Sequence, residues 1–247
     1  TRTTRGNKMK RLYPDVTCYQ NGFIEVGCGH SLYYEQSGNP KGIPVLFIHG
    51  GPGAGLPPNY KCFFDSNRYR IIGFEQRGCG RSTPLASTKD NDTWLNVEDI
   101  EILRRQLNVS SWLVFGGSWG STLALLYAFR YADHVSGLIL RGVFLARQQD
   151  RDWFLSPQGG AAQLFPEYYR QFVKGIDGSL STAAICTHYL NTLKADNEVQ
   201  RHAALKRWYQ WEERLSRVSL PPGTGDSTSQ YPLSLVTSHS RMPFLNE

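Results

Sequence analysis

A serine between glycines marks the place in this chain where residue types and spacing could do chemistry. Residues 116–120 read Gly-Gly-Ser-Trp-Gly, which fits the pattern Gly-x-Ser-x-Gly with Ser118 at its centre. An apolar run at 112–115 precedes this segment and a helix-like run at 122–131 follows it. A strand, a tight turn and a helix in this order are typical of a nucleophile elbow, which pushes the serine hydroxyl out of a sheet. We therefore expect Ser118 to be a nucleophile; the alternative is a glycine turn whose serine only caps the helix.

The three glycines around this serine should serve close packing. Such a turn brings its backbone near the neighbouring elements, where a β-carbon would collide with them. We therefore expect no room for a side chain at Gly116, Gly117 or Gly120.

A second glycine-rich turn follows the apolar run at 45–48. Residues 49–53 read His-Gly-Gly-Pro-Gly. A turn of this kind at the end of a buried strand can aim backbone N–H groups into a cleft, where they stabilise the oxyanion of acyl transfer. The alternative is a plain glycine and proline turn. His49, the first residue of the turn, is expected to support the loop rather than to act as a base.

Strand-like and helix-like runs alternate around these two motifs. Strands are expected at 23–26, 32–35, 45–48, 69–74, 112–115 and 137–140. Continuous apolar runs are typical of strands that are buried on both faces of a sheet. Between residues 45 and 141 the alternation with helices predicts a mostly parallel sheet with right-handed crossovers. The expected fold class is therefore α/β, with helices on both faces of the sheet.

Two helices and one polar loop are expected within this alternation. The run 97–107 is amphipathic, with Asn96 as its cap and its charged residues on a solvated face. The run 122–131 is apolar nearly all round, so we expect it to be buried. The glycine-punctuated loop 75–82 could form a phosphate-binding nest. No Gly-Lys-Ser/Thr follows it, which argues against a nucleotide site.

The character of the sequence changes after about residue 145. Helix-like segments are expected at 161–173, 181–193 and 198–215. Aromatic residues cluster in these segments, and we interpret them as a helical cap over the carboxyl edge of the sheet. The expected domain organisation is a basic tail at 1–11, a core at 12–145 and a cap at 146–247 that ends in an irregular segment.

Composition places the chain among globular proteins. Its 247 residues are 40% hydrophobic and 13% aromatic, which is enough for a sizeable core. No run of about 18 apolar residues exists, so we expect no membrane span. Nor is an apolar leader visible at the N-terminus. The five cysteines lack metal-binding spacing, which suggests reduced thiols and a cytoplasmic location, with no metal or cofactor.

The net charge of +6 is unevenly distributed. Five of the excess positive charges lie within residues 1–11, which leaves +1 for the rest of the chain. Because the body is near neutral, we expect no nucleic-acid partner. The basic tail is interpreted as a solvated arm, with a remnant of a targeting segment as the alternative. The oligomeric state stays open.

Together these motifs resemble one family, the prolyl aminopeptidases or proline iminopeptidases, which are α/β-hydrolase serine peptidases. The resemblance covers residues 12 to about 217. It rests on the segments 32–38, 49–53, 76–82, Trp94 with 97–101, 116–125, 140–145, and Trp208 with Trp211-Glu212. This resemblance implies an α/β-hydrolase fold with a helical cap. The implied activity is the release of an N-terminal proline from peptides, without a cofactor.

The resemblance also implies roles for individual residues. Ser118 matches the nucleophile, and the backbone N–H groups of Gly51 and Trp119 match the oxyanion hole. Glu212 matches one of the carboxylates that hold the substrate's amine, and the alternative for it is an exposed helix glutamate. Aromatic residues of the cap would wall a small pocket for the pyrrolidine ring.

Two departures from the family pattern affect these expectations. Glu75 stands where the family usually has an aspartate. The family's triad aspartate and histidine follow the last strands of the sheet, and no match to them is found here. Only Asp226 and His239 are downstream candidates, and neither follows an expected strand. We therefore expect a C-terminally incomplete chain that lacks part of the core and is inactive as it stands.

Two rival functions remain. One is an esterase or another α/β hydrolase with the same elbow. The other is a non-catalytic hydrolase-like protein that binds peptides, which the missing triad residues would favour. A comparison of ester and amino-acyl amide turnover separates the first from a peptidase, and covalent labelling of Ser118 by a fluorophosphonate would count against the second.

Overall fold

A six-stranded sheet forms the first layer of the computed structural model, which describes residues 12–216. Its strands are β1 (Cys18–Gly27), β2 (His30–Gly38), β3 (Ile43–Ile48), β4 (Tyr69–Phe74), β5 (Trp112–Gly117) and β6 (Val135–Arg141). They lie in the order β1-β2-β4-β3-β5-β6. The hairpin β1–β2 and the β2–β4 pair are antiparallel, whereas β4, β3, β5 and β6 run parallel. This mostly parallel sheet confirms the predicted α/β class.

Both faces of the sheet are covered by apolar side chains. On one face α1 (Thr93–Gln106) and α2 (Trp119–Arg130) pack over a cluster that includes Leu46, Ile72 and Val114. On the other face the aromatic residues around the short helix η1 (Tyr60–Phe63) cover Phe47 and Phe115. Leu46 and Phe47 are neighbours in β3 and belong to opposite clusters, because successive side chains of a strand point to opposite faces. This double burial explains the unbroken apolar run at 45–48.

The start and the charges of α1 differ from the prediction. Asp92 is the N-cap, and its carboxylate accepts the backbone N–H of Leu95 at 2.8 Å. Asn96, the predicted cap, lies inside the helix and donates to the Asp92 carbonyl oxygen at 2.7 Å. The predicted solvated face is correct for Arg105, which is exposed, but wrong for Asp99 and Glu101, which are buried. Both carboxylates have arginine partners, and pairing is what allows a charge to be buried.

The prediction that the helix after Ser118 is buried all round is correct for only part of it. Leu123 and Ala124 are fully buried against the sheet, but Phe129 is 85% exposed. A helix that packs on one face of a sheet buries one side of its surface only. Composition alone could not show which side of this apolar helix would face solvent.

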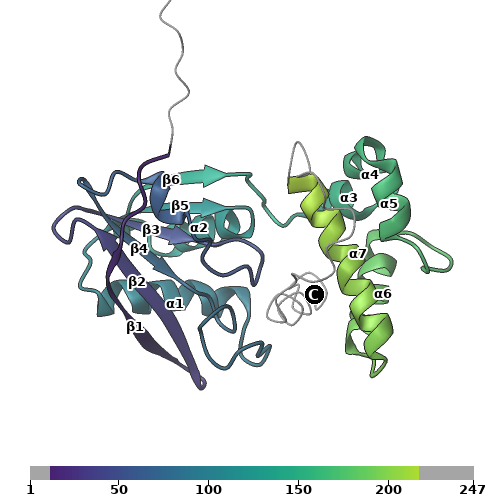
Figure 1. The fold of residues 1–247 in the computed structure, drawn as a ribbon, viewed down its shortest axis with the longest axis horizontal. Coiled ribbons are helices and arrows are strands. Elements are labelled where there is room, and N and C mark those ends of the chain that lie inside the picture. The colour runs from purple at the N-terminus through teal and green to yellow at the C-terminus, as the bar shows by residue number, and fades with distance from the viewer. Residues whose placement is uncertain (1–11, 217–247) are drawn as a thin grey trace, which may run out of the picture.

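Five helices form a second layer with a core of its own. They are α3 (Gln148–Leu155), α4 (Gly160–Leu164), α5 (Pro166–Phe172), α6 (Thr182–Lys194) and α7 (Glu198–Ser216). Figure 1 shows this group beside the sheet, on the side toward which the arrow of β6 points. The predicted helix at 161–173 is divided at Pro166, which lacks the N–H that a continuous helix needs. Helix α3 was not predicted.

The helical layer is held together by aromatic side chains. Phe172 of α5 packs against Tyr189 of α6 and against Trp208 and Trp211 of α7, at ring-centroid distances of 5.1–5.4 Å. The apolar clusters of the sheet and of this layer share no residue within 12–216. The domain boundary near residue 145 stays a prediction.

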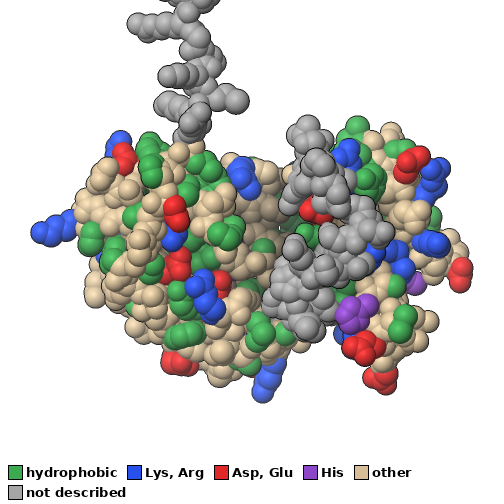
Figure 2. Space-filling model, in the orientation of Figure 1, with side chains coloured by type: hydrophobic (Ala, Val, Ile, Leu, Met, Phe, Trp, Pro, Cys, Tyr) green, Lys and Arg blue, Asp and Glu red, His purple; other side chains and the backbone are tan. Residues whose placement is uncertain are grey.

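The surface charge, the helix lengths and the cysteines can be compared with what the composition predicted. On the part of the face that Figure 2 describes, basic and acidic side chains are interspersed. Among the helices of residues 12–216, none has the length and apolar character that crossing a membrane requires. All five cysteines are free in the structure, and none lies in a disulfide.

Candidate active site

Ser118 lies at a sharp turn between β5 and α2. Its backbone has φ 54° and ψ −124°, a left-handed conformation that is uncommon for any residue except glycine. Its N–H donates to the carbonyl oxygen of Arg141 at 3.0 Å, which ties the turn to the end of β6. The side chain makes no capping hydrogen bond to α2, and the residue is exposed. The geometry therefore agrees with an elbow rather than with a serine cap.

Two of the three glycines leave no room for a β-carbon. A β-carbon on Gly116 would stand 2.2 Å from the carbonyl oxygen of Gly120, and one on Gly120 would stand 2.3 Å from that of Ile48. The expectation is wrong for Gly117, where the nearest atom would be 3.7 Å away. The backbone is crowded where α2 crosses the ends of β3 and β5. Gly117 lies on the other side of the turn, where there is room for a β-carbon.

The turn at 49–53 lies directly beside the elbow. A β-carbon on Gly50 would stand 3.4 Å from Cβ of Ser118. Gly51 has φ +117° and is exposed, and within the described residues its N–H has no acceptor. Trp119 is the first residue of α2, next to Ser118. The structure thus places Ser118, Gly51 and Trp119 in adjoining segments, and the role of Gly51 and Trp119 as an oxyanion hole stays a prediction.

His49 supports this turn instead of presenting a base. Its Nε2 accepts the backbone N–H of Gln76 at 3.0 Å, and its Nδ1 lies 2.9 Å from the carbonyl oxygen of Gly50. These partners select the neutral tautomer with the proton on Nδ1. Burial lowers the pKa of His49, which favours the same neutral form. Both ring nitrogens of His49 therefore make hydrogen bonds that hold the turn in place.

The loop at 75–82 is folded around the carboxylate of Glu75. That carboxylate accepts the backbone N–H of Arg81 at 2.5 Å and its guanidinium at 3.0 Å. Burial alone would raise the pKa of Glu75, but the hydrogen bonds from Arg81 outweigh it and hold the pKa below its usual value. A β-carbon on Gly80 would stand 2.3 Å from the same carboxylate. A carboxylate thus occupies this loop, which argues against a phosphate nest.

Two residues that sequence reasoning missed connect the elbow to the segment after β6. The Ser121 hydroxyl donates to the Ser118 carbonyl oxygen at 2.6 Å and accepts the N–H of Phe144 at 3.0 Å. The Thr122 hydroxyl donates to the Phe144 carbonyl oxygen at 2.6 Å. The sequence signal that could have revealed these two residues is a pair of hydroxyl side chains at the start of an otherwise apolar helix.

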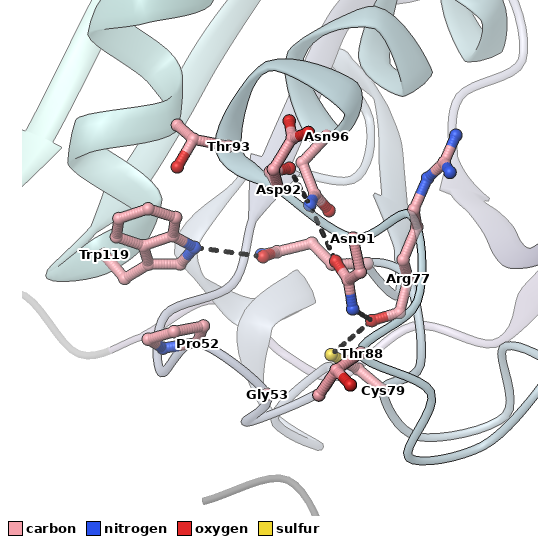
Figure 3. A pocket seen from close by; sticks show the side chains of 11 residues that line it. Pro52, Gly53, Arg77, Cys79, Thr88, Asn91, Asp92, Thr93, Asn96 and Trp119 are labelled. Atoms are coloured by element: carbon pink, nitrogen blue, oxygen red, sulfur yellow. Dashed lines mark hydrogen bonds between the residues drawn. The ribbon is translucent and has the colours of Figure 1, made fainter. Parts of the chain in front are cut away.

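A pocket borders the ring of Trp119 (Figure 3). Pro52 and Gly53 of the turn line one part of it, and Thr93 and Asn96 at the start of α1 line another. Its lining offers amide, hydroxyl and carboxylate groups. Within residues 12–216, no cluster of histidine, cysteine and acidic side chains could hold a metal ion.

The remaining predicted site residues lie elsewhere. Glu212 is on α7, in the helical layer, next to the buried Trp211. The other three candidates belong to the sheet layer, so Glu212 comes from a different part of the fold. Asp226 and His239 lie outside the described residues.

The sheet with an elbow serine at the end of β5 defines an α/β hydrolase. A family model described as the alpha/beta hydrolase fold matches residues 43–235. The chain is 46% identical over 214 residues to a probable proline iminopeptidase of Leptolyngbya boryana, covering 87% of this chain and 66% of that relative. It is 41% identical over 228 residues to the proline iminopeptidase of Neisseria meningitidis, covering 92% and 73%. The chain therefore belongs to the proline iminopeptidase family, as its motifs predicted.

A solved structure agrees on the fold. The proline iminopeptidase of Mycobacterium smegmatis superposes with a TM-score of 0.53 at 18% identity, covering 92% of this chain and 68% of that one. At this identity the likeness concerns the fold alone. The chain spans about two thirds of the length of the relatives that it matches.

Proposed function

We propose that this chain carries the nucleophile and the oxyanion hole of a serine exopeptidase that releases N-terminal proline from peptides. The observation that carries the proposal is Ser118, exposed at a left-handed turn directly beside Gly50 and Gly51. A strained serine at the end of a buried strand, with backbone donors next to it, is suited to acyl transfer.

In the proposed reaction the Ser118 hydroxyl oxygen attacks the carbonyl carbon of the N-terminal proline. The carbonyl oxygen becomes an oxyanion that accepts hydrogen bonds from the N–H groups of Gly51 and Trp119. The bond from the carbonyl carbon to the next residue's nitrogen then breaks, and that nitrogen leaves with a proton. Water afterwards hydrolyses the acyl-enzyme. Each backbone donor contributes on the order of 3 kcal/mol to stabilisation of the transition state.

The proton of Ser118 requires a base. None of the hydrogen bonds within 12–216 links a histidine to Ser118, and His49 has both nitrogens engaged. The proposal therefore assigns the base to a group outside these residues. Specificity for an N-terminal amine is assigned to Glu212, and the ring pocket to aromatic residues of the helical layer. Family membership and the peptide substrates implied by the relatives' names support this choice.

A direct test compares hydrolysis of a proline arylamide and of a simple ester. The Neisseria meningitidis relative serves as the positive control, and Ser118→Ala as the negative one. The missing triad residues predict an inactive chain, whereas a base within residues 217–247 would let wild type release the arylamine. In that case Ser118→Ala should lose at least about a thousandfold in kcat/KM. Turnover of esters only would refute the peptidase proposal.

The role of Glu212 has a matched control in its neighbour Glu213 on the same helix. Glu212→Ala should raise KM for the proline arylamide about tenfold or more while leaving ester hydrolysis unchanged, because it removes a charge partner of the substrate's amine. Glu213→Ala should leave both reactions near wild type. Equal effects of the two substitutions would remove Glu212 from the site.

A second candidate is a non-catalytic peptide-binding protein. The observation in its favour is that no hydrogen bond among the described residues joins Ser118 to a base. A fluorophosphonate reacts with an activated serine, so stoichiometric labelling that Ser118→Ala abolishes would exclude this candidate.

The free thiols are consistent with a cytoplasmic location, which we also propose.

A further inference from the structure

We propose that Gln76 is a positioning residue that sets the spacing between the two oxyanion donors. The inference rests on the proposed function, since it concerns the roles of Gly51 and Trp119. Gln76 is the second residue after β4 and is 3% exposed. Its hydrogen bonds reach both donor-bearing segments, which follow two other strands of the sheet.

On one side Gln76 holds the turn that carries Gly51. Its side-chain N–H donates to the carbonyl oxygen of His49 at 2.7 Å, and its backbone N–H donates to Nε2 of the same residue at 3.0 Å. His49 Nδ1–H in turn bonds the carbonyl oxygen of Gly50. The peptide groups just before Gly51 are therefore held by several hydrogen bonds, which connect them to Gln76 directly or through the His49 ring.

On the other side Gln76 holds Trp119. Its Oε1 accepts the indole N–H at 3.2 Å, the bond drawn from Trp119 in Figure 3. Trp119 is 5% exposed as a residue, so little of it, including this N–H, meets solvent. The amide nitrogen also lies 3.2 Å from Nδ1 of His49. The amide is oriented by its two other contacts, because a flip would set oxygen against the His49 carbonyl and N–H against the indole N–H. The side-chain amide of Gln76 thus makes a hydrogen bond to each of the two segments.

The link matters because the donors belong to different elements. Gly51 follows β3, whereas Trp119 begins α2 after β5. Their N–H groups must converge on a single oxygen atom, and a displacement of about 1 Å can cost about a hundredfold in rate. Gln76, from the end of β4, connects the two segments through its side chain. Loss of the amide should therefore reduce stabilisation of the oxyanion and leave ground-state binding of the substrate largely unchanged.

The kinetic test compares three variants. In Gln76→Leu we expect kcat for the proline arylamide to fall at least about tenfold with KM within about threefold of wild type. Gln36→Leu is the matched control, because Gln36 is equally buried and bonds Arg70 at the start of β4, away from the elbow. It should leave kcat within about threefold of wild type.

Gln76→Glu, the third variant, adds a pH readout that a purely structural role would not move. The introduced carboxylate, when ionised, would repel the His49 carbonyl oxygen, whereas the protonated acid can donate to that oxygen and still accept from Trp119. The ratio of kcat in this variant to kcat in wild type should therefore rise as pH falls. If Gln76→Leu fails to fold, this ratio carries the test, and a ratio independent of pH overturns the proposal.

A second readout needs no turnover. The indole N–H of Trp119, assigned in NMR spectra by its loss in Trp119→Phe, should exchange with solvent at least about tenfold faster in Gln76→Leu, because its acceptor is gone. Gln36→Leu should leave this exchange unchanged. If wild type is inactive, as the missing triad residues predict, the exchange rate decides the positioning role alone. An unchanged exchange rate, or a wild-type kcat in Gln76→Leu, overturns the inference.

Discussion

A β-carbon on Gly120 would stand 2.3 Å from the carbonyl oxygen of Ile48. This contact joins the first turn of α2 to the end of β3, and it leaves no flexible atom that could move aside. We therefore expect Gly120→Ala to push α2 away from the sheet and to lower the free energy of unfolding by about 3 kcal/mol or more. Urea denaturation measures this change.

Gly137 provides the control for this prediction. In β6 a β-carbon on Gly137 would stand 3.1 Å from Cδ1 of Leu113, which is a side-chain atom that can shift. Gly137→Ala should therefore change the free energy of unfolding by less than about 1 kcal/mol. Similar losses in the two variants would show that the Ile48 contact does not control the placement of α2.

Ser118 itself should be a source of strain. Ser118 has φ 54° and ψ −124°, a backbone conformation that is strained for any residue with a β-carbon. Glycine, which has no β-carbon, adopts positive φ readily. Ser118→Gly and Ser118→Ala both remove the hydroxyl, but only Ser118→Ala keeps the β-carbon. We expect Ser118→Gly to be more stable than Ser118→Ala by about 1–2 kcal/mol in urea denaturation, with both inactive. A more stable Ser118→Ala would contradict the idea that strain is stored at this turn.

The fold class and the main strands could be predicted because they depend on local patterns. The apolar run at 45–48 and the alternation up to residue 141 reflect burial on both faces of a parallel sheet. Burial within the helices could not be predicted in the same way. Asp99 and Glu101 look solvated in the sequence, yet both are buried because arginine partners reach them. One of these partners, Arg77, is distant in sequence, and its pairing depends on the tertiary structure.

The candidate site was predictable to a similar degree. Gly-x-Ser-x-Gly and His-Gly-Gly-Pro-Gly are local signals, and the structure brings them together because β3 and β5 are neighbours. The contributions of Gln76, Ser121 and Thr122 could not be read from the sequence, because they depend on where side chains point after folding. The placement of Glu212 depends on how the helical layer is arranged, which no local pattern determines.

The buried pair of Arg77 and Asp99 should be important for stability. Arg77 donates two hydrogen bonds of 2.7 Å to the Asp99 carboxylate and also bonds backbone oxygens of Val26 and Asp90. Removing one partner leaves an uncompensated charge in the interior. We expect Arg77→Met to lower the free energy of unfolding by about 3–5 kcal/mol.

The exposed pair of Arg147 and Asp150 is a suitable comparison for Arg77→Met. Its arginine side chain is 57% exposed, although the contact of 3.0 Å is similar in length. Arg147→Met should change the free energy of unfolding by less than about 1 kcal/mol, because solvent screens the interaction. If both substitutions cost the same, burial would not be the reason for the effect of Arg77→Met.

Acid should weaken the fold through Glu101. Burial would raise the pKa of its carboxyl, but hydrogen bonds from Arg104, Arg105 and Tyr127 outweigh burial and lower the pKa from 4.5 to about 2. A carboxyl whose pKa is lowered by folding stabilises the protein above its unfolded pKa, and this contribution disappears as pH falls through the folded pKa. It is therefore complete above about pH 5, amounts to at most about 3 kcal/mol, and is lost between about pH 4.5 and pH 2.

The difference in unfolding free energy between wild type and Glu101→Gln isolates this contribution from the other carboxyl groups. Measured by urea denaturation, it should be largest near neutral pH and shrink as pH falls toward about 2, because the protonated glutamate resembles glutamine there. Glu167, whose side chain is 83% exposed, supplies the control, and Glu167→Gln should show a small difference at every pH. A Glu101→Gln difference that stays constant with pH would mean that the carboxylate's charge does not stabilise the fold.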